Sequence, residues 1–279
     1  MTQIVAVHSY RGGTGKSNLV ANLAVLLAAR GMRVGVIDTD IQAPGAHVLF
    51  GIDTAEDAPC LGDYLSNGCQ IEEAARDLTG LACASPCPGA LFVIPSHAPP
   101  SKIIDIVSRQ YDVALLSSGF RRFAEVRGLD VLLLDTHPGM NNETVLALAL
   151  ADSVLIVTRP DHQEYRGAEV SVAVARTLNC PRVLVVVNMV STGSASDALA
   201  SRLPGAYAAE VAGVIPYHDD MADLASAGVL ASHDPGHELV GHFGRVADRL
   251  LEAPVRPSAL TECSPGERQV RGTRPPGAP

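Results

Sequence analysis

The sequence contains no tryptophan, and aromatic residues make up only 4% of its 279 positions. Proteins that bind single-stranded nucleic acid usually stack the bases on aromatic side chains, so this scarcity argues against such a function. No apolar run reaches the roughly 20 residues that a membrane-spanning helix needs. The formal net charge of −9 argues against a surface that nucleic acid wraps on all sides.

Six cysteines and an acidic net charge are compatible with a reducing compartment. We expect the first residues to form a core strand rather than a signal peptide, and therefore expect a cytoplasmic protein. The length and the 47% hydrophobic content suit a single α/β domain over residues 1–252. Residues 253–279 are rich in proline, glycine and arginine without hydrophobic periodicity, which predicts a disordered tail.

Continuous apolar runs recur along the chain, and several are separated by segments with helical periodicity. Runs that do not alternate with polar residues are typical of strands buried on both faces of a parallel sheet. The pattern predicts a doubly wound, mostly parallel sheet with helices on both faces, in which ligands bind at the carboxyl ends of the strands. The predicted strands cover residues 4–7, 33–37, 91–94, 131–134, 153–157 and 183–187.

A glycine-rich stretch that ends in Gly-Lys-Ser follows the first predicted strand. Glycines let backbone N–H groups pack against nucleotide phosphates, while a lysine supplies a cation and a hydroxyl supplies a ligand for Mg²⁺. The next helix would point its positive N-terminal end at the same phosphates. This order predicts a phosphate-binding loop for a nucleoside triphosphate. Its residues are Gly12, Gly13, Thr14, Gly15, Lys16, Ser17 and Asn18, with Ser17 as a metal ligand.

The loop departs from the common Gly-x-x-x-x-Gly-Lys-Ser pattern, because Tyr10 replaces the first glycine and Arg11 follows it. From Arg11 to Ser17 the chain resembles the deviant Walker A loop of the MinD/ParA ATPases, which usually have lysine at the position of Arg11. The resemblance implies an ATP-dependent homodimer in which this cation reaches the partner's nucleotide. Arginine keeps the positive charge, and its planar guanidinium group suits phosphate oxygens, so we predict a catalytic role for Arg11. We also predict a catalytic role for Lys16, the lysine of the loop. A surface arginine without such a contact is the alternative.

Carboxylates follow two further predicted strands. Asp38 and Asp40 come after the second strand, and Asp135 follows four apolar residues as a Walker B aspartate does. Near a bound nucleotide, such groups hold Mg²⁺ and order water. The resemblance implies that Asp40 orients the attacking water and that Asp38 lies near the metal. We therefore predict Asp40 as catalytic and Ser17, Asp38 and Asp135 as Mg²⁺ ligands; a pair of aspartates that only cap a helix is the alternative.

His137 stands where the family commonly has a proline, in an Asp-x-Pro-Pro-Gly segment. A histidine there either senses nucleotide or protons or is a structural hydrogen-bonding residue, and the sequence leaves both readings open. Residues 139–143 are expected to form a switch, because glycine permits backbone movement. Asn188 and Pro216 resemble the adenine-recognition elements of the family, although an asparagine at a strand end is also an ordinary turn residue.

Four cysteines, Cys60, Cys69, Cys83 and Cys87, lie in a polar segment between about residues 54 and 88. Their spacing is a weak metal signature, so we expect free buried thiols rather than a zinc or iron–sulfur site. Apolar residues between 61 and 71 predict short helices in this segment. Three later histidines are predicted to lie at the surface: His233, His237 and His242.

The resemblance does not fix the branch of the family. Nothing after Glu252 forms the basic amphipathic helix of MinD, so we expect no membrane binding. Arg121, Arg122 and Arg127 are the local basic candidates for nonspecific DNA contact, which we do not favour. The leading hypothesis is a slowly hydrolysing ATPase switch that positions or regulates an unidentified regulatory or cargo protein. The alternative is an ATP-dependent amidoligase or phosphoryl-transfer enzyme; a related tyrosine kinase is disfavoured because no tyrosine follows Tyr217.

Overall fold

Eight strands form one sheet in the residues that the computed structural model describes, which are 2–41, 43–52, 58–83, 86–96, 113–191, 209–224 and 227–252. In chain order the strands are β1 (Gln3–His8), β2 (Arg33–Asp38), β3 (Arg76–Asp77), β4 (Ala90–Ile94), β5 (Val131–Asp135), β6 (Ser153–Thr158), β7 (Arg182–Val190) and β8 (Glu210–Pro216). Their order across the sheet is β3-β4-β2-β5-β1-β6-β7-β8. Each pairing is parallel except that of β3 with β4.

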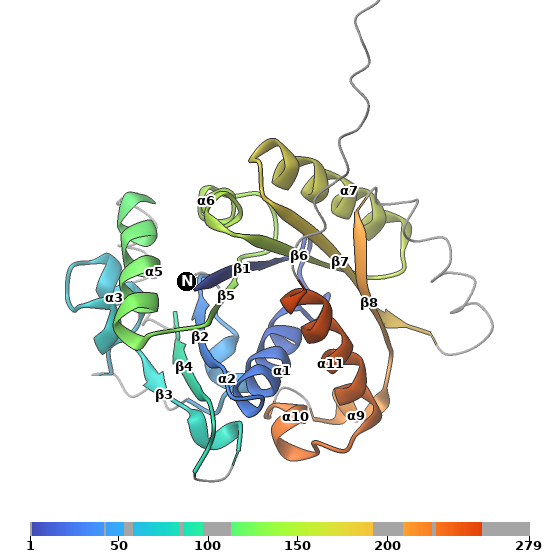
Figure 1. Cartoon of the computed structure of the whole chain (residues 1–279). Helices are drawn as coiled ribbons and strands as arrows, with labels where there is room; N and C mark the ends of the chain where they lie inside the picture. The colour runs from blue at the N-terminus through green and yellow to red at the C-terminus, as the bar shows by residue number, and fades with distance from the viewer. Residues whose placement is uncertain are drawn as a thin grey trace, which may run out of the picture.

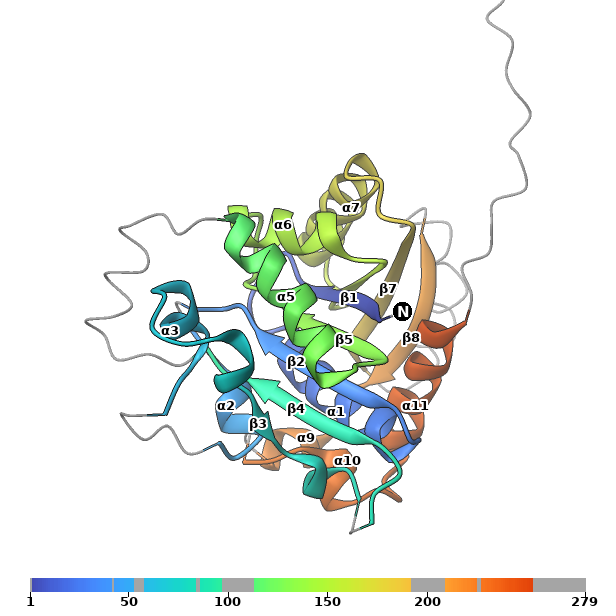
Figure 2. The same ribbon diagram turned by 60° about the vertical axis from the view of Figure 1, so that its left-hand side comes forward.

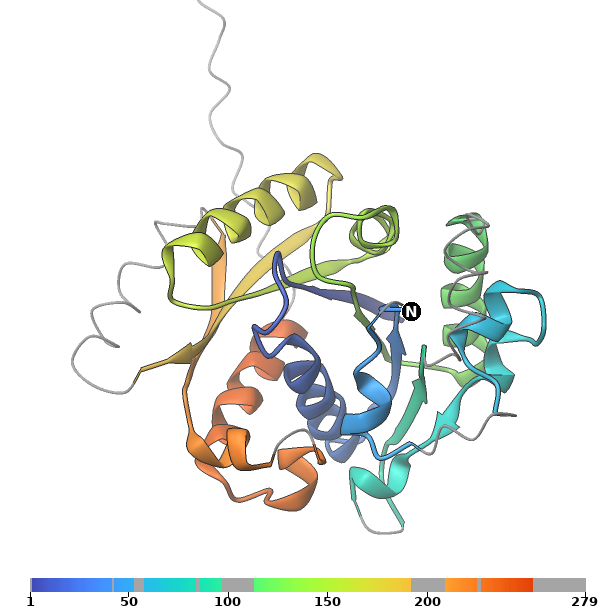
Figure 3. The same cartoon turned by 180° about the vertical axis from the view of Figure 1, so that it is seen from behind.

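Helices cover both faces of this sheet, as Figure 1 shows from one side and Figure 3 from behind. The α-helices are α1 (Lys16–Ala29), α2 (Ala46–Leu49), α3 (Leu61–Leu65), α5 (Val113–Arg127), α6 (Asn142–Leu150), α7 (His162–Thr177), α9 (Asp219–Asp223), α10 (Leu230–His233) and α11 (Glu238–Leu251). Two short 3-10 helices, η1 (Ile71–Glu73) and η2 (Thr79–Leu81), flank β3. The predicted fold class, a doubly wound and mostly parallel sheet, is confirmed.

Alternate residues of each strand pack into two separate cores. In β5, Val131 and Leu133 join the core formed with α1 and α11, whereas Leu132 and Leu134 join the core formed with α5, α6 and α7. Figure 2 shows α5 crossing the second face of the sheet. Burial on both faces is the reason that the apolar runs in the sequence are continuous.

The six predicted strands are all present, and the sequence reading missed the two edge strands. The two residues of β3 are too few to produce a periodic pattern. Along β8, only Ala212 and Ile215 are buried, so its sequence shows neither a continuous run nor a strict alternation. Both strands lie at the margins of the sheet.

The order of the strands reverses at the centre of the sheet, around β1. β1 lies between β5 and β6, and the chain continues from β1 to β2 on one side while β6, β7 and β8 extend the other side. Val7 is in register with Asp135, which is itself in register with Asp38. In doubly wound sheets, ligands bind where the strand order reverses, outside the carboxyl ends of the strands. The phosphate loop follows β1 and therefore lies at the place where the strand order reverses.

The polar segment before β4 forms the predicted short helices, α3 and η1, and its apolar side chains are buried. Tyr64 packs against Gly119 of α5 and donates a hydrogen bond to the carbonyl of Leu115 at 2.9 Å. The prediction of free thiols is wrong for Cys83 and Cys87, which form a disulfide bond with each other. It had rested on spacing in the sequence, which does not show which cysteines meet in space.

The remaining cysteines of this segment, Cys60 and Cys69, are free. Cys60 is buried, and burial raises the pKa of its thiol to about 11. No helix in the described part of the chain is long and apolar enough to cross a membrane. The predicted tail, residues 253–279, lies outside the described residues.

Candidate functional site

The loop between β1 and α1 has the backbone that its glycines permit. Gly13 and Gly15 have φ angles of 79° and 82°, in the left-handed region that side chains disfavour. A Cβ on Gly15 would lie 2.4 Å from Nδ2 of Asn188, so a side chain there is also excluded by contact. A Cβ on Gly12 or Gly13 would meet no atom within 4 Å, and residues 11–13 are exposed. This open backbone, at the N-terminus of a 14-residue helix, fits phosphate groups.

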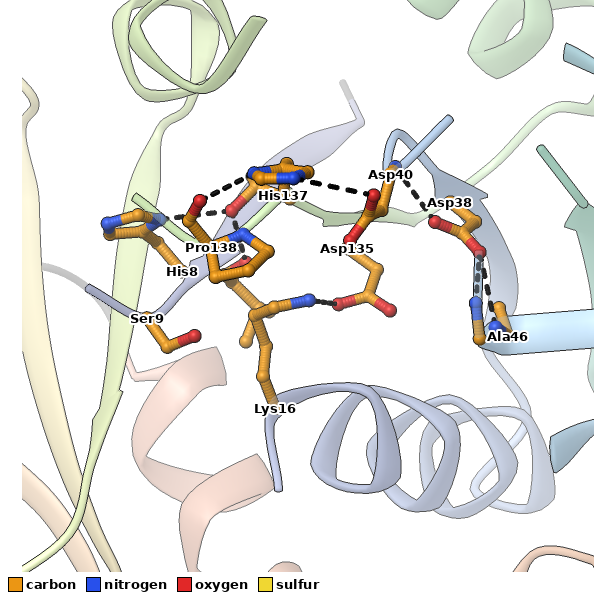
Figure 4. A network of polar contacts seen from close by, with 12 residues as sticks. His8, Ser9, Lys16, Asp38, Asp40, Ala46, Asp135, His137 and Pro138 are labelled. Atoms are coloured by element: carbon orange, nitrogen blue, oxygen red, sulfur yellow. Dashed lines mark hydrogen bonds and ion pairs between the residues drawn. The ribbon is translucent and has the colours of Figure 1, made fainter. Parts of the chain in front are cut away.

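Lys16 and Asp135 form a buried ion pair at the centre of the site, as Figure 4 shows. Lys16 begins α1, while Asp135 ends β5, and both side chains are almost inaccessible to solvent. Ser17, the next residue of α1, is half-buried. The structure therefore brings together the lysine of the loop and the predicted Walker B aspartate.

Asp38 is fully buried beside Asp135, and both burial and the Asp135 carboxylate raise the pKa of Asp38 to about 7. Two adjacent buried carboxylates repel each other, and a divalent cation between them relieves this repulsion, so the pair fits Mg²⁺. Asp38 also accepts backbone N–H groups from Gly45 at 3.2 Å and Ala46 at 3.1 Å, at the start of α2. Asp38 thus makes the helix-capping contacts that the alternative reading proposed. The role of Asp38 as a metal ligand stays a prediction.

Asp40 lies on the other side of the Asp38 carboxylate, to which its backbone N–H donates at 2.9 Å. Its own Oδ1 accepts the backbone N–H of Ala43 at 2.9 Å, and its carbonyl accepts the hydroxyl of Ser96 at 2.9 Å. The Nε2 atom of His137 lies 3.8 Å from the same Oδ1 (Figure 4). The carboxylate of Asp40 is therefore held in one position, next to His137, whose role the sequence leaves open.

His8, the last residue of β1, belongs to the site, although the sequence reading did not select it. Its Nδ1 lies 3.1 Å from the hydroxyl oxygen of Thr136, which donates to the carbonyl of Val7. Nδ1 is therefore the protonated nitrogen, and the buried Nε2 has no hydrogen-bond partner among the described residues. Burial, and secondarily Lys16 and His137, lower the pKa of His8 to about 3. The sequence did contain a signal for His8: it is a polar residue at the end of an apolar run, directly before the phosphate loop.

A cavity of about 130 Å³ opens beside the phosphate loop, between the loop and α11. Both predicted adenine-contact residues, Asn188 and Pro216, line it together with Gly15 and Asn18 of the loop. Asn188 donates from Nδ2 to the carbonyl of Thr14 at 2.8 Å, which joins the end of β7 to the loop. The walls of the cavity are mainly apolar, as they are in sites for flat heterocycles. Leu19, Ile215, Leu239 and Phe243 provide much of this wall.

One histidine near this cavity is more buried than predicted. The sequence predicts His237 at the surface, but its side chain is only 11% exposed, and its Nε2 lies 3.0 Å from Asp220 Oδ2. Its ring packs edge-on against His218, which lines the cavity. In each ring Nδ1 accepts a backbone N–H at a helix start, so Nε2 keeps the proton in the neutral form. His233 is exposed, as predicted, and His242 is half-buried.

Arg11 takes no part in the buried network around Lys16. It is exposed, and its Nη1 donates to Oε1 of Gln163 on α7. The ring of Tyr10 packs on Gly167 of the same helix, where a Cβ would lie 2.5 Å from the ring. These residues and Arg166 line an open cavity of about 470 Å³. Tyr10 and Arg11 thus contact α7 rather than the buried site around Lys16.

The arginines considered for DNA contact are largely engaged within the chain. Arg122 donates to both carboxylate oxygens of Glu72, at 2.9 and 2.6 Å. Arg127 donates to the backbone carbonyl of Glu72 and lies over the ring of Phe92. Arg121 is exposed on α5. Two of the three guanidinium groups therefore have partners on this face.

Comparison with known proteins adds a family model, described as an AAA domain, that matches residues 2–179 and so contains the phosphate loop and all three aspartates. The chain belongs to the MinD/ParA family of ATPases. The solved MinD cell division protein of Aquifex aeolicus has the same fold, with a TM-score of 0.73 at 20% identity over 91% of this chain and 100% of that one. MinD of Pyrococcus horikoshii, complexed with Mg-ADP, gives 0.72 at 18% identity over 90% and 97%.

Curated relatives of this MinD/ParA-family chain carry several names. An iron–sulfur cluster carrier protein of Methanococcus maripaludis is 32% identical over 66% of this chain and 59% of its own length. The antiactivator FleN of Pseudomonas aeruginosa is 26% identical over 78% and 75%. An ATP-binding protein of Methanocaldococcus jannaschii is 27% identical over 70% and 67%. These matches support nucleotide binding and a regulatory role in general terms.

Proposed function

We propose that this chain is a nucleotide-switched ATPase. It binds Mg²⁺-ATP, forms a homodimer around two nucleotides, hydrolyses ATP slowly and positions or regulates a partner protein. The observation that carries the proposal is the position of Arg11. This cation belongs to the phosphate loop, yet it lies exposed against Gln163 of α7, outside the buried network of Lys16. A second copy of the chain offers a phosphate group for it to contact.

Each part of the site has a proposed role. The loop backbone and Lys16 would hold the phosphates, and Ser17, Asp38 and Asp135 would hold Mg²⁺. Mg²⁺ would supply positive charge that neutralises phosphate oxygens during transfer. Asp40 would orient water, and the cavity at Asn188 and Pro216 would hold the base. What supports this assignment is that the residues converge at one edge of the sheet.

The names of relatives support one part of the proposal, the regulation of a partner protein. FleN is named an antiactivator, which implies a partner whose activity it lowers. We do not propose iron–sulfur cluster transfer, the function in the name of another relative, because no observation favours it. Among the described residues, the two cysteines that meet, Cys83 and Cys87, are bonded to each other.

Sedimentation with a slowly hydrolysed ATP analogue tests the dimer. Arg11→Ala should bind ATP nearly normally but weaken association at least a hundredfold, because a symmetric dimer loses two charge-assisted contacts of about 1.5–3 kcal/mol each. Arg11→Lys, which carries the residue usual in the family, should recover much of the dimer. Arg166→Ala is the matched control, since Arg166 lines the same cavity with a side chain that is 87% exposed.

Two results would reject the trans contact: a wild type that stays monomeric at every concentration, or an Arg11→Ala variant that dimerises as well as wild type. Either result would favour the alternative of an ATP-dependent metabolic enzyme that acts on a small molecule. Such an enzyme should turn over rapidly only when a carboxylate or another acceptor substrate is present.

A further inference from the structure

We propose that His137 is a further catalytic residue for ATP hydrolysis, which holds the attacking water jointly with Asp40. This inference rests on the proposed function, since it concerns the hydrolytic step of the same site. It goes beyond the family resemblance, because a proline commonly stands at the position of His137. Proline offers no side-chain nitrogen that could accept a hydrogen bond.

The tautomer of His137 follows from its nearest neighbour. Its Nδ1 makes a short hydrogen bond with the backbone carbonyl of Pro138. A carbonyl oxygen only accepts, so Nδ1 must carry the proton and donate it. In the neutral ring, Nε2 then presents a lone pair, and this lone pair is on the side of the ring that faces Asp40 (Figure 4).

Two hydrogen-bond acceptors therefore face each other across 3.8 Å, the Nε2 atom of His137 and the Oδ1 atom of Asp40. The distance is too long for a direct hydrogen bond, and neither neutral Nε2 nor a carboxylate has a proton to share. A single water molecule satisfies both, because its two hydrogens can donate to two acceptors at about 2.8 Å each. Its oxygen lone pairs are then directed away from both acceptors and are free to attack an electrophile.

Both acceptors are held in place by the surrounding chain. The carbonyl of His137 accepts the hydroxyl of Thr144 at 3.1 Å, which ties the residue to α6. The carboxylate of Asp40 is fixed by the N–H of Ala43 at 2.9 Å. The His137 side chain is 26% exposed and that of Asp40 is 10% exposed, so water can reach the pair. Preorganised groups of this kind orient a nucleophile without reorganisation during the reaction.

In the proposed step, the water oxygen forms a bond to the γ-phosphorus of ATP while the bond from phosphorus to the β–γ bridging oxygen breaks. ADP leaves with the electron pair of that bond. One water proton passes to the Asp40 carboxylate and from there to solvent. The other proton, held by His137 Nε2 until the bond forms, remains on the inorganic phosphate.

Single-turnover hydrolysis and ATP affinity, measured on the same variants, test the proposal. His137→Phe keeps a ring but removes the acceptor, so the rate should fall at least tenfold while ATP affinity stays within about threefold. His137→Gln offers an amide oxygen and should keep the rate within about fivefold of wild type. His137→Pro installs the residue common in the family and should lose as much as His137→Phe, which provides a second variant if the phenylalanine disturbs folding.

A double-mutant cycle separates shared water positioning from a structural effect. If His137 and Asp40 hold one water, the double variant Asp40→Asn/His137→Phe should be no more than about threefold slower than Asp40→Asn alone, with Lys16→Ala as the zero-rate baseline. Losses that multiply, or a wild-type rate in His137→Phe, overturn the inference. A wild-type rate in Asp40→Asn instead overturns the assignment of Asp40 in the proposed function, so the two failures are distinguishable.

Discussion

The ammonium group of Lys16 and the carboxylate of Asp135 neutralise each other in a buried ion pair between the start of α1 and the end of β5. The two residues are 119 positions apart in the chain. Each charge is shielded from water, so each depends on the other for compensation. The pair therefore contributes to the fold as well as to the candidate site.

Lys16→Ala should abolish ATP binding, because it removes the main point charge on the phosphates. It should also lower the free energy of unfolding by about 3–5 kcal/mol, since Asp135 would remain as an uncompensated buried charge. Adding Asp135→Asn should restore much of that stability and none of the ATP binding. Urea denaturation and calorimetric titration measure the two effects. Nucleotide affinity within about threefold of wild type in Lys16→Ala would contradict the assignment of the loop.

Gly167→Ala should destabilise the protein by about 1–3 kcal/mol, because the new Cβ would lie 2.5 Å from the Tyr10 ring. In a Tyr10→Gly background the same change should become neutral or stabilise by up to about 1 kcal/mol, through helix propensity. Gly241→Ala is the control, since it also lies in a helix and its Cβ would meet only Arg245 at 3.8 Å. A loss in Gly167→Ala that persists without the tyrosine ring would show that contact with Tyr10 is not its cause.

The buried His8 should make the protein less stable as the pH falls below about 6.5. In the unfolded chain it takes up a proton near its ordinary pKa of 6.5, whereas in the folded protein it does so only near pH 3. Between these values the unfolded state binds one more proton, so stability falls toward acid pH by about 1.4 kcal/mol per unit.

Asp38 acts in the opposite direction, because its raised pKa makes stability fall as pH rises from 3.8 toward 7. The difference between wild type and His8→Gln isolates the histidine. With a metal chelator present, the urea midpoint of wild type minus that of His8→Gln should fall as the pH is lowered from about 6.5 to 4. Parallel curves would mean that His8 protonates alike in both states.

Much of the fold was predictable because burial leaves a local trace in the sequence. Leu132 and Leu134 face one core while Val131 and Leu133 face the other, so β5 appears as an unbroken apolar run. Glycines with positive φ mark the phosphate loop in the same local way. Strand β8 left no such trace, because its buried residues, Ala212 and Ile215, form neither a continuous run nor an alternation.

Contacts between distant segments were not predictable from local patterns. Gln163 lies 152 positions from Arg11, and nothing in either segment identifies the other as its partner. The position of His137 facing Asp40 depends on the register of β2 with β5. The tautomer of His8 depends on a hydroxyl that only the fold brings near. Sequence motifs thus supplied the candidate residues, and topology supplied their partners.

Tyr217, which lines the cavity beside Asn188, is 50% exposed in a chain that contains no tryptophan. The protein therefore has no indole fluorescence of its own. A tryptophan placed at this position would be its sole fluorophore of that kind, on the wall where a nucleobase would exclude water. Nucleotide entry and release would then change this indole emission in real time with unlabelled ligand, and no other indole in the sequence would contribute to the signal.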